Sequence, residues 1–285
     1  MTEYRHLISA KELQQHLADL SWTVVDCRFD LMQPDRGFEE YRQGHIPGAV
    51  YANLDNDLAG PVTESTGRHP LPSAEAFAEM LGKWGIRNDS QVVVYDHGSG
   101  AIAARLWWML QWLGHQQTAV LDGGYAAWLA DGQAVSDSVE TIGAATFHPS
   151  PDSKWLISTE QMEALIESDD APLIVDARDA ARFDGRTEPI DTVAGHIPGA
   201  ANHPFSKAID ASGYWKTSEE LREGWQGVLG EGAERAWVAM CGSGVTACHL
   251  ALSAALAGYC SPRLYIGSWS EWIRDPERPI AADLR

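Results

Sequence analysis

Two stretches of the chain, QVVVYDHGSGAIAARLWWML at residues 91–110 and AWVAMCGSGVTACHLALSAA at residues 236–255, decide the fold. Each begins as a short apolar run, passes through a glycine-rich loop and continues with the periodicity of a helix. Short apolar runs bounded by turn residues are typical of buried strands. The two stretches therefore predict one strand–loop–helix unit that the chain uses twice.

Three further pairs of similar segments keep the same order along the chain. Their offsets lie between 144 and 151 residues, close to the offset of the first pair. A shared motif order at a near-constant offset indicates two copies of one domain. The pairs are TVVDCR (23–28) with LIVDAR (173–178), GHIPGAV (44–50) with GHIPGAA (195–201), and LDGGYAAW (121–128) with YIGSWSEW (265–272).

The repeats predict the domain boundaries. We expect an N-terminal domain at 1–142 and a C-terminal domain at 156–285. The stretch between them, GAATFHPSPDSKW at 143–155, is polar and contains two prolines. Such composition is typical of a connection outside regular structure, so we predict a linker there.

Within each copy, short apolar runs alternate with segments of helical periodicity. The runs at 23–27, 91–96 and 119–123 are rich in β-branched residues and end at turn residues, as buried strands do. The helical segments that begin at Ser73 and Ser158 each start with a residue that favours the N-cap position. This alternation predicts an α/β fold in which each domain has a central parallel sheet flanked by helices.

Composition limits the classes of partner. The chain has 285 residues, a formal net charge of −19 and 45% hydrophobic residues. Nucleic acids and anionic membranes require a basic face, so we expect neither as a partner. The N-terminal sequence has no apolar signal core and no apolar stretch has the length of a membrane span, which favours a cytoplasmic protein. The four cysteines lack CxxC spacing, which favours reduced thiols over a disulfide framework or a zinc site.

The loop of the second copy, CGSGVTA, begins with a cysteine at the end of the predicted strand. Ligands of parallel sheets bind beyond the carboxyl ends of the strands, where loops lead into helices. Gly242 and Gly244 permit backbone angles that turn successive N–H groups inward, and their partial positive charge favours the nucleophilic thiolate of Cys241. We therefore predict a nucleophile at Cys241; the alternative is a buried structural cysteine. Cys248 and Cys260 are expected to be small apolar fillers.

The first copy has Asp96 at the position that matches Cys241. A carboxylate does not replace a soft sulfur nucleophile, so we expect the N-terminal loop to be non-catalytic. Residues that occur in both copies are then expected to be structural, namely Arg28 with Arg178 and His45 with His196.

These motifs resemble those of the tandem-domain rhodanese superfamily, and within it those of the 3-mercaptopyruvate sulfurtransferases. The resemblance covers essentially the whole chain and is carried by the two GHIPGA motifs, RLWWML, LDGG..AW and, above all, CGSGVTAC. It implies two rhodanese domains, each with a central parallel sheet flanked by helices. Related thiosulfate sulfurtransferases carry basic residues directly after the cysteine, where this chain has Gly242 and Ser243.

The resemblance also implies a reaction. The Cys241 thiolate would take sulfur from 3-mercaptopyruvate as a persulfide and release pyruvate, in two half-reactions. An acceptor such as cyanide, a small thiol or reduced thioredoxin would then remove the outer sulfur. Neither a metal nor a cofactor is expected. The loop and helix start would bind the substrate through Gly242, Gly244, Val245 and Thr246.

By the same resemblance, Ser243 would act in a relay with His69 and Asp55. Taken without the resemblance, His69 is more readily interpreted as a loop histidine that caps a turn. The segment that holds both partners is about three residues longer than the family pattern, which makes the match of Asp55 less direct than that of His69.

The donor carboxylate requires a bidentate cation, and arginine supplies one. The resemblance implies two arginines between the second VDAR and the second GHIPG. The first matches Arg182, but Ile190 and Asp191 stand where the second is expected. We predict that Arg186 takes over this role, the alternative being a solvated surface arginine.

Three alternatives differ in function. A phosphatase loop would need an arginine six residues after the cysteine, where this chain has Ala247. A thiosulfate sulfurtransferase is the nearest enzymatic alternative. The third alternative is a non-catalytic sulfur carrier or binding module, against which the intact Cys241 argues.

Overall fold

The computed structural model describes residues 3–139, 142–168, 171–230 and 236–282. The chain divides into two compact units, which we call unit 1 and unit 2. Unit 1 comprises Met1–Gly60, Leu71–Asp152 and Asp210–Trp215, and unit 2 comprises Pro61–Pro70, Ser153–Ile209 and Lys216–Arg285. The short segment Pro61–Pro70 thus belongs to unit 2, although in sequence it lies within the first repeat.

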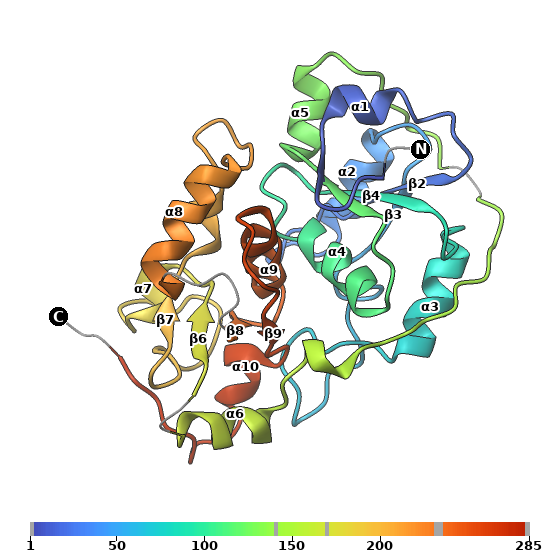
Figure 1. The fold of residues 1–285 in the computed structure, drawn as a ribbon. Helices are drawn as coiled ribbons and strands as arrows, with labels where there is room; N and C mark the ends of the chain where they lie inside the picture. Colours follow the sequence, from blue (N-terminus) through green and yellow to red (C-terminus); the bar gives the residue numbers. More distant parts are fainter. Residues whose placement is uncertain (1–2, 140–141, 169–170, 231–235, 283–285) are drawn as a thin grey trace. The chain divides into compact units, whose positions relative to one another are not determined.

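Each unit contains one sheet in which every strand pairing is parallel (Figure 1). The order is β1-β5-β4-β2-β3 in unit 1 and β7-β6-β8-β9 in unit 2. The predicted runs at 23–27, 91–96 and 119–123 form β2, β4 and β5, each within two residues of the predicted bounds. The strands are β1 (Leu7–Ile8), β2 (Trp22–Asp26), β3 (Val50–Tyr51), β4 (Gln91–Tyr95), β5 (Thr118–Leu121), β6 (Leu173–Asp176), β7 (Ala201–Asn202), β8 (Trp237–Met240) and β9 (Arg263–Leu264).

Helices connect the strands in both units, so the predicted α/β fold with flanked parallel sheets is confirmed. The helices of unit 1 are α1 (Ala10–Gln14), α2 (Arg36–Gln43), α3 (Ala74–Lys83), α4 (Ala103–Trp112) and α5 (Gly124–Ala130). Those of unit 2 are α6 (Thr159–Ile166), α7 (Ala180–Phe183), α8 (Ser218–Leu229), α9 (Thr246–Leu256) and α10 (Ser268–Trp272), together with the 3-10 helices η1 (Ser153–Trp155) and η2 (Phe205–Ala208).

The predicted N-caps are confirmed. Ser73 Oγ accepts the N–H of Ala76 at the start of α3. Ser158 forms a reciprocal capping box with Gln161 at the start of α6. These side chains satisfy backbone donors that a helix start leaves without partners.

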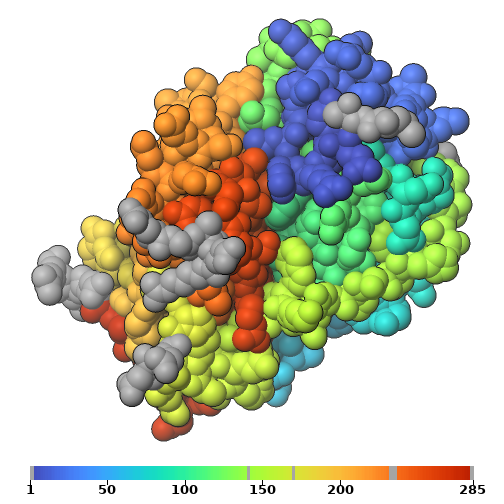
Figure 2. All heavy atoms as spheres, in the orientation of Figure 1, coloured from blue at the N-terminus to red at the C-terminus, as the bar shows by residue number. Residues whose placement is uncertain are grey.

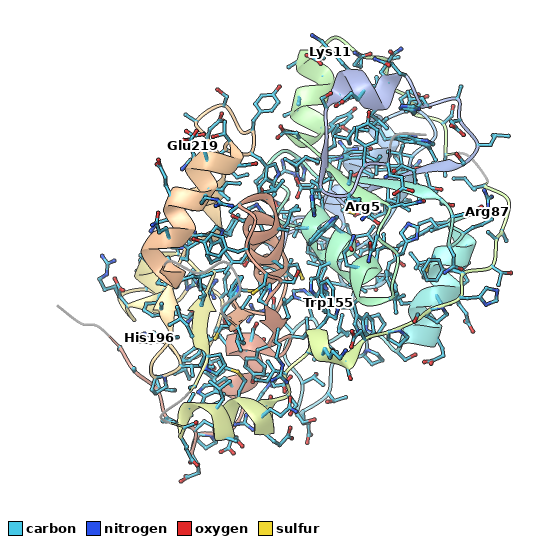
Figure 3. All side chains as sticks on the ribbon, in the orientation of Figure 1. Arg5, Lys11, Arg87, Trp155, His196 and Glu219 are labelled. Carbon is cyan, nitrogen blue, oxygen red and sulfur yellow. The ribbon has the colours of Figure 1, made fainter. Side chains whose placement is uncertain are left out.

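Helix α8 shows how the helices cover the sheets. Its buried residues Leu221, Trp225 and Leu229 follow one another at intervals of four, which places them on one face. The opposite face is exposed, and the side chains of α8 (orange) lie at the surface in Figure 2. Glu219 in its first turn is labelled at the outside of unit 2 in Figure 3. No helix among the described residues is both long enough and apolar enough to cross a membrane.

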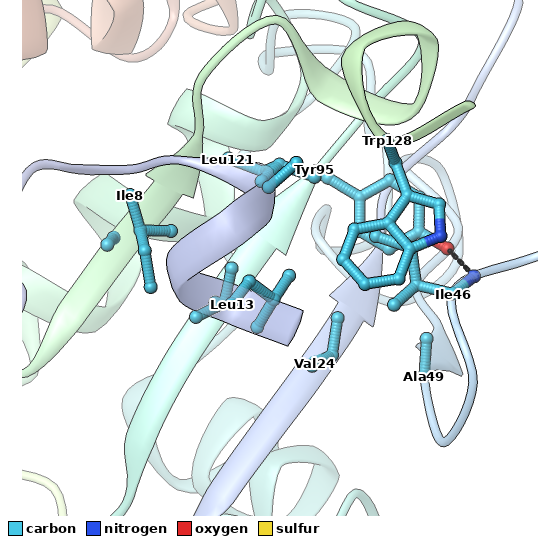
Figure 4. Packing of buried hydrophobic residues seen from close by; sticks show 11 residues of the cluster. Ile8, Leu13, Val24, Ile46, Ala49, Tyr95, Leu121 and Trp128 are labelled. Atoms are coloured by element: carbon cyan, nitrogen blue, oxygen red, sulfur yellow. Dashed lines mark hydrogen bonds between the residues drawn. The ribbon is translucent and has the colours of Figure 1, made fainter. Parts of the chain in front are cut away.

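The core of unit 1 uses alternate residues of its central strands (Figure 4). Val93 and Tyr95 of β4 pack with Val24 of β2 and Trp128 of α5. The Tyr95 hydroxyl accepts the N–H of Ile46 at 3.2 Å. The period of two follows from the pleat of a strand, and the intervening residues of β4 are buried as well. Burial of both faces explains why the strand sequence is continuously apolar.

Unit 2 repeats this arrangement. Val238 and Met240 of β8 pack with Met162 of α6 and with Trp269 and Trp272 of α10. Cys241 follows Met240 directly, so it lies at the carboxyl end of a strand with neighbours on both sides. The fold therefore places this residue at the edge of the sheet where ligands of α/β proteins bind.

The arginine two residues after β2 in unit 1 and after β6 in unit 2 has the same contacts in both units. Arg28 donates to the Asp26 carboxylate at 2.6 Å and to the carbonyl of Gly44 at 2.8 Å. Arg178 donates to Asp176 at 2.7 Å and to the carbonyl of a second glycine at 2.8 Å. These buried pairs tie the end of a strand to the following loop, which supports the structural role expected for both arginines.

Candidate active site

The sulfur of Cys241 lies inside the glycine loop that follows β8. The N–H of Gly244 points to Cys241 Sγ at 3.1 Å. Gly244 has a φ of +77°, and a Cβ there would lie 2.4 Å from the carbonyl oxygen of Ile266. Only glycine fits this position, because the backbone is left-handed and the neighbouring chain is too close. The loop therefore aims a backbone donor at the sulfur, where it stabilises negative charge.

The start of α10 holds this loop from the other side. The N–H of Cys241 donates to Ser268 Oγ at 3.0 Å, and the carbonyls of Cys241 and Gly242 accept the N–H groups of Trp269 and Ser270 at 3.0 and 2.8 Å. Ser268 has a φ of +52°, a left-handed conformation that costs free energy for a residue with a side chain. Its hydroxyl bond to Cys241 offsets part of this cost.

The segment Pro61–Pro70 docks on the same helix start. The N–H of Gly67 donates to the Glu271 carboxylate at 3.1 Å, and the N–H of Arg68 donates to Ser270 Oγ at 3.0 Å. A Cβ on Gly67 would lie 2.5 Å from the carbonyl oxygen of Gly267, so only glycine permits this approach. One helix start thus fixes both the cysteine loop and the segment that carries His69.

His69 and Ser243 lie together as the sequence predicts. His69 Nδ1 and Ser243 Oγ are 2.7 Å apart, and the two side chains are buried. Both residues belong to unit 2, because the segment of His69 is part of that unit. Asp55 belongs to unit 1, where its N–H donates to the Asn53 side chain at 3.0 Å. A contribution of Asp55 to the relay stays a prediction.

Arg182 lies on α7 beside the cysteine loop. Its Nη2 and Nη1 would be 3.5 and 3.6 Å from a Cβ built on Gly242. Glu188 accepts from Arg182 Nε at 2.9 Å, and Asp191 accepts from Nη2 at 3.0 Å. The two carboxylates hold the guanidinium in place next to the nucleophile.

Arg68 is the site residue that the sequence analysis missed. Its Nη2 would be 3.1 Å from a Cβ on Gly242, and its Nη1 pairs with Asp191. Burial lowers the pKa of the Arg68 guanidinium, whereas the charge of the nearby Cys241 thiolate raises it. A signal was present in the sequence: Arg68 directly precedes His69, which was already expected at the site.

Arg186 lies apart from this arrangement. Its Nη2 pairs with Asp184 at 2.7 Å, and 53% of its side chain is exposed. These contacts match the alternative of a solvated surface arginine. Its assignment to donor binding stays a prediction without support from the described contacts.

The remaining predicted residues lie where the loop enters α9. Val245 is the N-cap of α9 and Thr246 is its first residue. Cys248, one turn further on, is fully buried and its thiol donates to the carbonyl of Gly244 at 3.3 Å. This position agrees with the packing role that was expected for Cys248.

The matching loop of unit 1 holds an anion of its own. Asp96 Oδ1 accepts the N–H groups of Gly98 and Gly100 at 2.9 and 3.0 Å. Asp96 Oδ2 accepts those of Ile102 and Ala103 at 2.9 and 3.2 Å. The same backbone cradle therefore surrounds a carboxylate in unit 1 and a sulfur in unit 2, which agrees with the anion-binding character predicted for the loop.

The arrangement in unit 2 has the composition of a covalent catalytic site: a cysteine sulfur to which a backbone N–H group points, a hydroxyl–imidazole pair, and two guanidinium groups. The sequence comparisons agree with it. The chain belongs to the rhodanese-like domain family, whose pattern matches residues 9–131 and 158–275.

The relatives define the class of enzyme. A Pseudomonas aeruginosa protein with the name "Probable 3-mercaptopyruvate sulfurtransferase" is 45% identical over 96% of this chain and 97% of its own length. The thiosulfate sulfurtransferase of Gallus gallus is 34% identical over 99% of this chain and 98% of its own length. The chain is accordingly a sulfurtransferase of the group that contains both activities.

Solved structures show the same fold. The 3-mercaptopyruvate sulfurtransferase of Leishmania major matches with a TM-score of 0.83 at 31% identity, over 94% of this chain and 74% of that one. The 3-mercaptopyruvate sulfotransferase SseA of Escherichia coli matches with a TM-score of 0.82 at 30% identity, over 94% of this chain and 100% of that one. The predicted pair of rhodanese domains is confirmed.

Proposed function

We propose that this sulfurtransferase takes sulfur from 3-mercaptopyruvate, holds it as a persulfide on Cys241 and passes it to a thiol or to cyanide, with release of pyruvate. The observation that carries the proposal is the Cys241 sulfur at 3.1 Å from the Gly244 N–H, in a loop flanked by two guanidinium groups. A donor with a thiol and a carboxylate requires a sulfur nucleophile next to a cation. The name of the Pseudomonas aeruginosa relative supports the same donor.

In the first half-reaction the Cys241 thiolate attacks the thiol sulfur of the donor. A sulfur–sulfur bond forms while the bond between that sulfur and C3 of the donor breaks. The electron pair remains on C3 and is delocalised as the enolate of pyruvate. The transferred sulfur keeps its proton and becomes the outer SH of the persulfide.

The enolate then needs a proton on C3. Ser243 stands two residues after the nucleophile, and its hydroxyl is 2.7 Å from His69 Nδ1. We infer that Ser243 donates the proton and that His69 replaces it, which is general acid catalysis through a hydroxyl. Asp55 is the predicted orienting carboxylate of this relay.

The donor must also be oriented. The Arg182 guanidinium lies on the side of the loop to which a side chain at position 242 would point. A carboxylate bound there would be held by charge-assisted hydrogen bonds, with the backbone at Gly244, Val245 and Thr246 around the reacting sulfur.

In the second half-reaction the acceptor attacks the outer sulfur of the persulfide. The sulfur–sulfur bond breaks, and its electron pair returns to Cys241 as the thiolate. Cyanide, a small thiol or reduced thioredoxin meets the chemical requirement for the acceptor, since each is a nucleophile for divalent sulfur.

Thiosulfate is the second candidate donor, and the Gallus gallus relative with that name supports it. It carries two negative charges, whereas Gly242 and Ser243 add no cation to the loop. We expect kcat/KM for 3-mercaptopyruvate to exceed that for thiosulfate by at least about tenfold, which corresponds to roughly 1.4 kcal/mol in the transition state.

The test is a kinetic comparison of the two donors, with pyruvate release and the mass of the Cys241 peptide as readouts. We expect pyruvate and a gain of one sulfur atom on Cys241 with 3-mercaptopyruvate. The Cys241→Ser variant should lose both, and the matched Cys248→Ser variant should keep most of the activity. Equal or better efficiency with thiosulfate would refute the donor assignment, and a protein that gains no sulfur from either donor would be a binding module.

A further inference from the structure

We propose that Arg68 is a second donor-binding cation at the Cys241 loop, and that Asp191 is the residue that positions it. This inference deepens the proposed function and rests on it, because the ligand in question is the carboxylate of the donor. Ile190 and Asp191 stand where the family resemblance implies an arginine. In this chain the second arginine would come from a different segment of the fold.

The two guanidinium groups converge on one point. A Cβ built on Gly242 would be 3.1 Å from Arg68 Nη2 and 3.5 Å from Arg182 Nη2. Arg68 is carried by the segment Pro61–Pro70 and Arg182 by α7, so neither depends on the other for its backbone position. The space that a side chain at Gly242 would fill is therefore bordered by two cations.

Arg182 alone offers only part of its guanidinium group to a ligand carboxylate. Its Nε donates to Glu188 at 2.9 Å, and its Nη2 donates to Asp191 at 3.0 Å and lies 2.8 Å from a Glu188 oxygen. A carboxylate has two oxygens and binds most tightly when both accept hydrogen bonds. One nitrogen from Arg182 and Nη2 of Arg68 together supply the two donors.

Asp191 makes this pairing of like charges possible. One of its oxygens accepts from Arg68 Nη1 and the other from Arg182 Nη2, and only 4% of its side chain is exposed. Two half-buried guanidinium groups would repel each other without a counter-ion between them. An acidic residue at this position therefore keeps the two arginine side chains close together.

The cluster also leads us to expect a preference for a singly charged donor. Its cations and its carboxylates are equal in number, so a donor with one negative charge adds less uncompensated charge to the site than a dianion does. The cations are Arg68, Arg178 and Arg182, and the carboxylates are those of Asp176, Glu188 and Asp191.

The closing experiment measures the anion preference of Cys241 without any sulfur donor. Iodoacetate and iodoacetamide alkylate the same sulfur, but only iodoacetate carries a carboxylate. The rate constant for each reagent is measured at the Cys241 peptide by mass spectrometry, in the wild type and in Arg68→Ala, Arg68→Lys and Arg87→Ala. Arg87 is a matched control, because it is an exposed arginine on the surface of unit 1 that pairs with Asp89 (Figure 3).

We expect the iodoacetate-to-iodoacetamide ratio of rate constants to fall about tenfold or more in Arg68→Ala, as is typical for loss of a charge-assisted pair. Arg68→Lys should recover part of the ratio, because the charge remains while the fork is lost. Arg87→Ala should leave it unchanged. Arg68→Ala should also raise KM for 3-mercaptopyruvate by about tenfold or more, with a smaller effect on kcat.

A ratio that stays at the wild-type value in Arg68→Ala would overturn the inference. So would an equal loss of rate with both reagents, since that result indicates a purely structural role for Arg68. The inference can survive failure of the proposed function: a wild type that releases no pyruvate but shows the expected ratios would have the anion site without this donor.

Asp191→Asn tests the positioning role. The variant removes one negative charge and leaves one acceptor oxygen for the two arginines. We expect a lower kcat/KM for 3-mercaptopyruvate and a rise of about threefold or more in the efficiency of thiosulfate relative to it, since the site then carries an excess positive charge. An unchanged ratio of the two donors would exclude Asp191 as a determinant of the anion charge.

Discussion

Ser243 and His69 are 174 positions apart in the sequence and share a hydrogen bond of 2.7 Å. Both side chains are buried, so the bond is shielded from water. A hydroxyl and an imidazole at this distance form a unit that can move a proton. The two residues should therefore act together in catalysis.

The prediction at this scale is non-additivity. Ser243→Ala and His69→Ala should each lower kcat by about 100-fold, in the range of general acid catalysis. The double variant should lose little more than either single variant, because removal of one member already disables the pair. The measurement is pre-steady-state pyruvate release, with circular dichroism as the control for folding. Fully additive losses would remove the relay from the mechanism.

Arg68 shows where prediction from the sequence ended. The residue pattern itself predicts Cys241, and the family resemblance implies Ser243 and His69. The position of Arg68 directly before His69 is a signal in the sequence, but its place beside the Cys241 loop depends on how Pro61–Pro70 docks in unit 2. The sequence instead predicts Arg186 as the second donor-binding arginine, since it lies close in sequence to the expected position.

The element that fixes the site is the short helix α10. Its start binds the carbonyls of the cysteine loop and also receives the segment with Arg68 and His69. The strands and helix caps were predictable, since they depend on local periodicity and on single residues such as Ser73 and Ser158. The role of α10 was not predictable, because no local pattern relates Ser268, Ser270 and Glu271 to the distant segments that their side chains bind.

Gly67 is the position at which this docking can be tested. In Gly67→Ala the new Cβ would be 2.5 Å from the carbonyl of Gly267 and 2.8 Å from Ser270 Oγ, so the segment must shift. We expect a loss of about 1–3 kcal/mol in stability from the overpacked contact. Since the segment carries Arg68 and His69, kcat/KM should fall by about tenfold or more.

The matched control for this variant is Gly227→Ala. Gly227 lies on the exposed face of α8, where a Cβ meets nothing within 4 Å. Activity should be retained, and stability should rise by up to about 1 kcal/mol because alanine is the better helix former. A Gly67→Ala enzyme with wild-type kinetics would show that the close approach does not position the catalytic residues.

At the scale of the whole molecule, acid stability of unit 2 should depend on His203. Burial, followed by the charges of Lys207 and Lys216, lowers the pKa of His203 to about 4. The unfolded chain binds this proton near pH 6.5, so it holds more protons than the folded chain between pH 6.5 and 4. Stability should therefore fall as the pH decreases through this window, by about 3 kcal/mol in total.

Urea unfolding at a series of pH values measures this dependence. His203→Gln should flatten the slope between pH 6.5 and 4, whereas His148→Gln, at an exposed position, should leave it unchanged. An identical slope in wild type and His203→Gln would mean that other groups cause the acid instability.

The two copies of the domain use one cradle for two purposes. In unit 2 the N–H of Gly244 points to a nucleophilic sulfur, and in unit 1 four N–H groups close on the Asp96 carboxylate. The repeat was evident from the sequence, and so was the absence of a cysteine in the first copy. Only the structure shows that the Asp96 carboxylate accepts the N–H groups of its loop. The first copy thus has a structural carboxylate where the second copy has a reactive sulfur.

Asp96→Ala is the variant that tests this exchange. It leaves four backbone donors of a partly buried loop without their carboxylate, and each such loss is costly. We expect the stability of the protein to fall by about 3 kcal/mol or more, seen as a lower midpoint in thermal unfolding. Activity at 25 °C should remain near that of the wild type, because Cys241, Ser243 and His69 belong to unit 2. Asp89→Ala, which removes the same charge from a side chain that is 80% exposed, should change neither quantity. A large loss of activity in Asp96→Ala at a temperature where the protein is folded would contradict the structural role and place the loop of unit 1 within the mechanism.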